Sequence, residues 1–146
     1  MNIFHSDTGL AIELSKEDFT AKIISSKVVV FDSNEYKITT IGQESFKYNR
    51  RIKSIAFSKD SEVELICRNS FKVSSIESIS IPAKVKQIED FAFYDCSNLR
   101  IVEFAENSQL ISIGNEVFYS TNISNIKIPK HVQTIGQVSF SYCKKL

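Results

Sequence analysis

The sequence of 146 residues contains no tryptophan, only four glycines, two prolines and two histidines. The glycines form neither a G-x-G-x-x-G pattern nor a P-loop, so no phosphate-binding loop of either kind is expected. The three cysteines lack a C-x-x-C pair, and with two isolated histidines they do not supply the four converging ligands of a zinc site. We therefore predict neither a metal nor a cofactor.

Long apolar runs and an excess of one charge are also missing. No run approaches about 18 apolar residues, which predicts no membrane insertion. The 18 basic and 17 acidic residues are interspersed and leave a net charge of +1, which argues against nucleic acid or an anionic membrane as the main partner. The first residues lack the basic and apolar regions of a signal peptide, so we expect none.

A tandem repeat dominates the sequence instead. Isoleucines open the units at spacings that alternate between 25 and 22 residues, a period of 47: Ile41, Ile66, Ile88, Ile113 and Ile135. Each is followed after five residues by a phenylalanine: Phe46, Phe71, Phe93, Phe118 and Phe140. This regularity predicts stacked units that share one continuous core, because a single unit cannot bury its own apolar face.

Each unit also contains a short segment in which apolar and polar residues alternate. The segment Leu99-x-x-Val102-x-Phe104 matches L-x-x-L-x-L, the strand pattern of leucine-rich repeats, and residues 79–81 and 126–128 alternate in the same way. We therefore predict one short strand per unit in a parallel sheet, with about 4.8 Å between strands.

A longer pattern, Ser80-Ile81-Pro82-x-x-Val85-x-x-Ile88-x-x-x-x-Phe93-x-x-Cys96-x-x-Leu99, resembles the BspA-type (treponemal-type) leucine-rich repeats of bacterial and protist surface proteins. The resemblance covers roughly residues 38–146. It implies an α/β repeat fold, a right-handed solenoid with parallel strands on the concave face and short helical or turn crossovers on the convex face. It also implies a cell-surface protein that adheres to host or matrix proteins.

The chain divides into two predicted parts. Residues 1–37 form an N-terminal cap, with a short helix at about 16–23 and a degenerate first repeat whose strand is 28–31. Residues 38–146 form about four and a half repeats of alternating 25 and 22 residues. The last unit stops at Leu146, where a core strand is expected to begin, which suggests end-to-end self-association through this uncapped repeat.

Catalysis by a cysteine is not expected. Cys96 and Cys143 occupy the same position of the repeat and are predicted to be buried, whereas Cys67 is predicted to lie near the surface. No pattern places His5 or His131 beside a cysteine, so we predict that the protein is not an enzyme.

The outward positions of the predicted strands are the candidate binding face. They are Ser54, Ala56, Ser78, Ser80, Ile101, Glu103, Asn125 and Lys127. Most residues of this face are small and few are charged, and it lacks the aromatic anchors typical of binding hot spots. Tyrosines in the crossovers are instead expected to pack against one another: Tyr48, Tyr94, Tyr119 and Tyr142.

Three functional hypotheses follow. The family resemblance favours an adhesin-like module with a protein ligand. The absence of a signal peptide favours a cytoplasmic scaffold, and the plain candidate face favours a structural spacer that has no ligand of its own.

Overall fold

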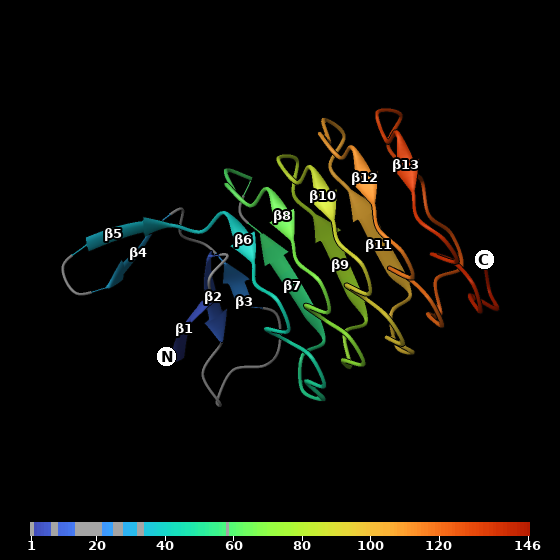
Figure 1. Ribbon diagram of the computed structural model, residues 1–146, viewed down its shortest axis with the longest axis horizontal. Coiled ribbons are helices and arrows are strands. Elements are labelled where there is room, and N and C mark those ends of the chain that lie inside the picture. Colours follow the sequence, from blue (N-terminus) through green and yellow to red (C-terminus); the bar gives the residue numbers. More distant parts are fainter. Residues whose placement is uncertain (1, 7–8, 14–21, 25–27, 32–33, 58) are drawn as a thin grey trace.

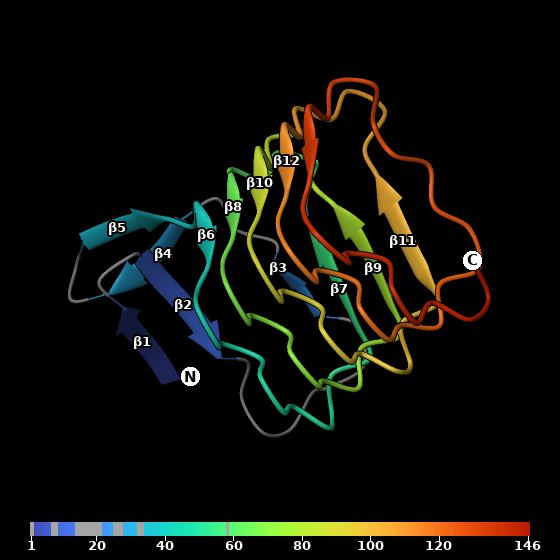
Figure 2. The ribbon, with the colours of Figure 1, turned by 45° about the vertical axis from the view of Figure 1, so that its right-hand side comes forward.

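The computed structural model describes residues 2–6, 9–13, 22–24, 28–31, 34–57 and 59–146, and most of its strands stack in parallel along a coil (Figures 1 and 2). Two sheets run along the stack. The long-strand sheet contains β3 (Lys22–Ile24), β7 (Ser54–Phe57), β9 (Ser78–Ile81) and β11 (Ile101–Phe104). The short-strand sheet contains β6 (Thr40–Ile41), β8 (Leu65–Ile66), β10 (Gln87–Ile88), β12 (Ser112–Ile113) and β13 (Thr134–Ile135).

The long-strand sheet has the alternation that the sequence predicts. Strands β9 and β11 pair in parallel along four residues, with Ile79 opposite Val102 and Ser80 opposite Glu103. The two apolar side chains are buried and the two polar ones are exposed. One face of this sheet therefore belongs to the core and the other faces solvent.

The short-strand sheet carries the isoleucines that open the units. Each of its strands has only two residues, and its second residue is the repeat isoleucine. The isoleucines of β6, β8, β10 and β12 are buried, while Ile135 of β13 is 48% exposed. This second sheet was not predicted, because two residues are too few to show a strand period.

The repeat phenylalanines form a continuous stack through the core. Neighbouring rings lie 4.9–5.4 Å apart between centroids, and their planes are within 20° of parallel. Phe71, Phe93 and Phe118 are fully buried. The stack confirms the predicted repeat and its shared core.

The third side of the coil, the turn face, is formed by the residues around each phenylalanine. Of the predicted helical or turn crossovers, the turns form here, and the described residues contain no helix. The residues two before and two after each phenylalanine have positive φ, for example Glu44 (59°) and Tyr48 (60°) around Phe46. A left-handed residue at each of these places ends any helical turn before it can propagate.

Backbone hydrogen bonds explain why the turn face keeps this conformation. At each of the four contacts between units, three N–H groups donate to carbonyl oxygens of the following unit, over 2.7–3.3 Å. Around Phe93, for example, the N–H groups of Phe91, Phe93 and Asp95 donate to Asn115, Val117 and Tyr119. These donors hold neighbouring units together, whereas in a helix they would bond within their own unit.

The N-terminal part differs from the predicted cap. Of the expected helix at 16–23, residues 16–21 lie outside the described residues, and Lys22 and Ile23 belong to β3, which pairs in parallel with β7. The expected strand at 28–31 forms as β4 (Val28–Phe31), but it pairs antiparallel with β5 (Asn34–Lys37) and not with the long-strand sheet.

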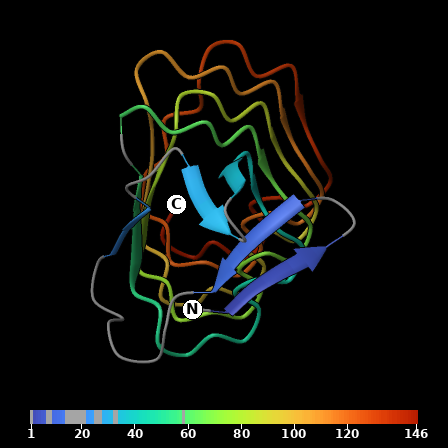
Figure 3. The ribbon, with the colours of Figure 1, turned by 90° about the vertical axis from the view of Figure 1, so that its left-hand side faces the viewer.

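The antiparallel strands β1 (Asn2–Ser6) and β2 (Gly9–Glu13) lie across the N-terminal end of the coil (Figure 3). β2 also packs beside β6, the first strand of the short-strand sheet. Whether residues 1–37 act as a cap remains a prediction.

The predicted strand at 126–128 does not form. This segment lies 47 residues after β9 and occupies the equivalent place in the next repeat. It has Asn125 and Lys127 where β9 has Ser78 and Ser80. Among the described residues, no backbone hydrogen bond joins 124–128 to β11, although the N–H of Asn122 still donates to Leu99. The chain therefore separates from β11 after residue 122.

Candidate protein-binding surface

The long-strand sheet assembles most of the predicted binding face. Register places Ser54, Ser78 and Ile101 side by side on β7, β9 and β11, and Ser80 beside Glu103. The pairing of β7 with β9 ends at Ile55, so Ala56 has no registered partner in β9. On its other side, Ala56 pairs with Ile23 of β3.

The chemistry of this face is mixed. Ile101 is 53% exposed, and the exposed Glu103 accepts a hydrogen bond from the hydroxyl of Ser80 at 3.2 Å. Ser54 and Ser78 are half-buried. The face therefore offers one apolar side chain and one carboxylate on a strand that is held firmly by β9.

Asn125 and Lys127 are exposed, but a groove separates them from the rest of the predicted face. This β11 groove is lined by residues 100–109 on one side and 124–131 on the other. It consists of two adjoining cavities of about 530 Å³ and about 770 Å³, which share Phe104 and Lys127. Figure 2 shows the chain beyond β11 arching away from that strand.

The groove opens at a place where the preceding repeat is closed. In the first 47-residue repeat, the turns that leave β7 and β9 are joined by an ion pair between Glu62 and Lys84 at 2.6 Å. Their counterparts 47 residues later are Gln109 and His131, which both line the groove and cannot form the same carboxylate–ammonium pair. Among the described side chains, no hydrogen bond joins these two residues.

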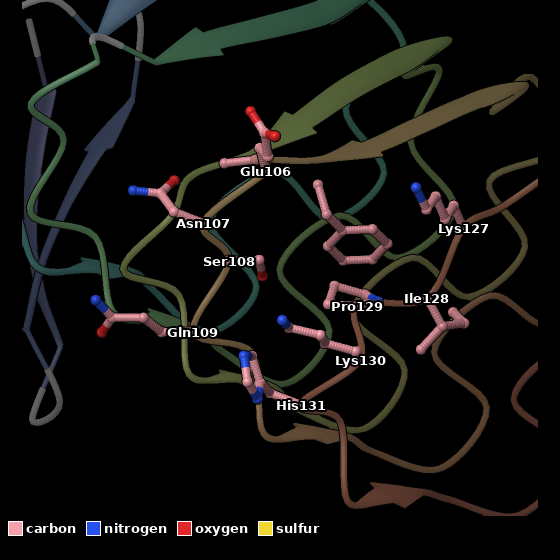
Figure 4. Close-up of a pocket in the computed structure, with 11 residues that line it drawn as sticks. Glu106, Asn107, Ser108, Gln109, Lys127, Ile128, Pro129, Lys130 and His131 are labelled. Carbon is pink, nitrogen blue, oxygen red and sulfur yellow. The ribbon is translucent and has the colours of Figure 1, made fainter.

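The two walls differ in charge, although the β11 side also contains the cationic Arg100. Glu103 and Glu106 belong to the β11 side, and Lys127 and Lys130 to the other. Figure 4 shows Glu106 and Asn107 on one side of the larger cavity and Lys127 and Ile128 on the other. No salt bridge crosses the groove among the residues that the structure describes.

The backbone edge of β11 faces this groove. The N–H groups of Ile101 and Ala105 donate to Glu77 and Ile81, so these residues face β9. Successive residues of a parallel strand face opposite neighbours, so the N–H groups of Val102 and Phe104 point to the groove. Within 124–128, which lies across it, the structure has no backbone partner for them.

Comparisons with known proteins fit this architecture. The family model "BspA type Leucine rich repeat region" matches residues 14–146 in six copies. The chain belongs to this BspA-type family. The match to the family model confirms the predicted resemblance. No curated protein matches the sequence.

Two solved structures share the BspA-type chain's fold. A leucine-rich repeat protein from Bacteroides ovatus ATCC 8483 is 27% identical, with a TM-score of 0.80 over 99% of this chain and 38% of its own. The pneumococcal vaccine antigen PcpA is 20% identical, with a TM-score of 0.69 over 97% of this chain and 47% of its own. This chain thus spans less than half the length of either. Leucine-rich repeat proteins are generally non-enzymatic modules for protein interaction.

Tyrosines form a second ladder on the turn face of the BspA-type chain. The rings of Tyr94 and Tyr119 stack at 4.9 Å, and the ammonium of Lys72 lies 4.7 Å from the Tyr94 ring centroid. Packing between crossovers is thus confirmed for these two tyrosines, and the Tyr142 ring also lies against Tyr119, at 5.0 Å between centroids. Tyr142 is tilted by 51° against Tyr119 and is 66% exposed, and Tyr48 is 57% exposed.

Burial differs among the three cysteines: Cys67 and Cys96 are buried, whereas Cys143 is only partly buried, so the burial predicted for Cys96 and Cys143 is confirmed for Cys96 alone. Cys96 is buried, its thiol donates to the carbonyl of Phe71 at 3.0 Å, and burial raises its pKa to about 11. The prediction for Cys67 is wrong, because this side chain is only 3% exposed. It lies between neighbouring units that cover its position from both sides.

Two negative findings concern the described residues alone. They contain no group of three potential metal-binding side chains, and no helix long and apolar enough to cross a membrane.

Sequence reasoning located the outward residues of the sheet but missed the β11 groove. The available signal was the change from Glu62 and Lys84 to Gln109 and His131 between equivalent turns. That change indicates a lost ion pair only once the two turns are known to be neighbours in the fold.

Proposed function

We propose that this chain is the interaction module of an adhesin-like surface protein, and that it binds host or matrix proteins through the long-strand sheet. The observation that carries the proposal is the solvent-facing row of β11, where Ile101 and Glu103 stand exposed on a strand held in place by four registered pairs. A rigid surface binds at a lower entropic cost than a mobile one.

The composition of the face supports a protein ligand. Covering Ile101, which is 53% exposed, would remove the rest of this aliphatic side chain from water and contribute about 0.8–1.6 kcal/mol, about half the value for a fully exposed one. Glu103 supplies a carboxylate that can select a partner by charge. The small serines beside them allow another protein surface to approach closely.

The test is a pull-down of purified matrix proteins with the chain and its charge-swapped variant Glu103→Lys plus Lys127→Glu. We expect the wild-type chain to capture a matrix protein and the variant to lose it. The matched control is Glu64→Lys plus Lys86→Glu, which reverses an exposed ion pair of 2.8 Å on the short-strand side and leaves the net charge unchanged.

Three results would overturn the proposal. Matrix binding that survives the swap at Glu103 and Lys127 would remove the long-strand sheet from the mechanism. Capture of cytosolic proteins alone would favour an intracellular scaffold. Capture of no protein from either source would favour a structural spacer.

A further inference from the structure

We propose that the β11 groove binds an extended segment of a partner protein as an added strand, in which aliphatic residues alternate with small uncharged polar residues. The inference rests on the proposed protein-binding function and deepens it by naming the chemistry of the bound segment. Three features of the groove carry it: a free backbone edge, apolar inner walls and opposed outer charges.

The free edge supplies the hydrogen bonds. The N–H groups of Val102 and Phe104 face the groove, and the facing segment 124–128 forms no backbone bond with them. Unpaired donors and acceptors on a strand edge are a template for another strand. An added strand at about 4.8 Å from β11 would continue a sheet that already runs through β3, β7 and β9.

The inner walls select the aliphatic residues. Val102 is 5% exposed, and Phe104, Ile126 and Ile128 are only partly buried against the core. Side chains of an added strand that point inward would lie between Val102 and Ile126 and between Phe104 and Ile128. Aliphatic residues at alternate positions would cover the partly buried side chains of Phe104, Ile126 and Ile128.

The outer walls select uncharged residues between the aliphatic ones. An outward side chain would lie between Glu103 on β11 and Lys127 on the opposite wall. Either charge on the ligand would be attracted by one wall and repelled by the other, so a charged residue gains little and loses hydration. A serine or threonine avoids that loss. β9, with the sequence Ser-Ile-Ser-Ile, shows that this alternation suits the sheet.

The groove is large enough for such a segment. Four extended residues are about 13 Å long, which matches the four-residue β11. The adjoining cavities, about 530 Å³ and about 770 Å³, lie within the usual range for ligand sites, about 300–1,000 Å³. A partner segment would therefore occupy the smaller cavity beside β11 and leave through the larger one.

The probe is a synthetic peptide with Thr-Ile-Thr-Ile at its centre and Ser-Gly flanks, titrated into the chain labelled with ¹⁵N. Amide hydrogen exchange at Val102 and Phe104 is the readout. We expect fast exchange in the free protein and at least tenfold slower exchange with saturating peptide. Binding without slower exchange at these two amides, no binding at millimolar peptide, or slow exchange already in the free protein would each overturn the proposal.

Two peptide controls separate strand addition from general stickiness. N-methylation of every isoleucine or of every threonine removes the donors along one edge of the peptide or the other, and we expect only one of these peptides to lose binding. Equal loss from both would contradict a strand that pairs with β11. Replacing the second threonine by lysine should weaken binding two- to fivefold, and Lys127→Glu should reverse that preference.

A third variant tests the opening of the groove. Gln109→Glu plus His131→Lys introduces the charge pair that joins the equivalent turns of the first repeat. We expect the pair to draw the walls together and to abolish peptide-induced protection at Val102 and Phe104. Unchanged peptide binding in a variant shown by NMR to have closed the groove would contradict the proposal.

The charge swap of Glu103 and Lys127 distinguishes this inference from the broader one. It reverses the outward face but still leaves one carboxylate and one ammonium across the groove, so peptide affinity should change less than twofold. Loss of matrix binding with intact peptide binding would support both proposals. If the swapped variant still binds matrix protein and the peptide still protects the two amides, only the proposal for the groove stands. If the swap abolishes matrix binding and the peptide protects neither amide, only the proposal for the sheet face stands.

Discussion

Replacing Phe93 by leucine should destabilise the protein more than the same change at Phe46. Both side chains are buried, but Phe93 stacks on two rings, at centroid distances of 4.9 and 5.4 Å, whereas Phe46 stacks on one, at 5.0 Å. Each aromatic pair contributes about 0.5–1.5 kcal/mol beyond the area that it buries. Lost stacking therefore amounts to about 1–3 kcal/mol for Phe93→Leu and about 0.5–1.5 kcal/mol for Phe46→Leu.

Urea denaturation measures the difference directly. The free energy of unfolding should fall further for Phe93→Leu by about 0.5–1.5 kcal/mol, with the dependence on urea concentration unchanged in both variants. The comparison cancels much of the common cost of replacing a buried phenylalanine by leucine. Equal losses, or a larger loss at Phe46, would refute the stack as an energetic unit.

Two further predictions concern single residues. Burial raises the pKa of Cys96 from 9.0 to about 11 in the folded protein, so on raising the pH the thiol ionises in the unfolded chain before it ionises in the folded one. The stability that the neutral thiol contributes is therefore complete below pH 9 and is lost as the pH rises to 11. The loss should be about 3 kcal/mol and absent in Cys96→Ala, as measured by urea unfolding across that range. Val73 has a φ of 57°, which strains a β-branched residue, so Val73→Asn should stabilise the fold by about 1 kcal/mol. A lower thermal midpoint for this variant would contradict that strain.

The core was predictable because its signal is repeated. Each unit places an isoleucine and a phenylalanine at the same offset, and the same alternation marks most of the long strands, so one irregular unit does not obscure the pattern. The structure bears this out with the ring stack and the register of Val102 on Ile79.

The turn face could not be predicted in the same way. Left-handed backbone is ordinarily signalled by glycine, but here glutamate, valine, phenylalanine and tyrosine occupy those places, as at Glu44, Val73, Phe91 and Tyr142. The bonds that hold them run to the next unit. A conformation stabilised by neighbours in space leaves little trace in local sequence.

The candidate site was predicted in part for a related reason. Outward positions such as Ser80 and Glu103 follow from strand alternation alone. The position of Lys127 depends instead on whether its segment pairs with β11, and that depends on contacts between turns far apart in the chain. A sequence therefore predicts where a strand forms more readily than where two neighbouring segments fail to pair.

The turn face also contains a row of aligned peptide groups. All twelve inter-unit bonds made by the residues two before, at and two after the phenylalanines run in one direction, from an N–H to a carbonyl of the next unit. Peptide dipoles aligned in this way add up, as they do in an α-helix, while those of the sheets largely cancel. In a helix the positive pole is the N-terminus, but here the N–H groups point toward the C-terminal units. Each added repeat would therefore lengthen this row on the turn face, while bonds such as that from Gly114 N–H to the Ile88 carbonyl run in the opposite direction elsewhere in the coil.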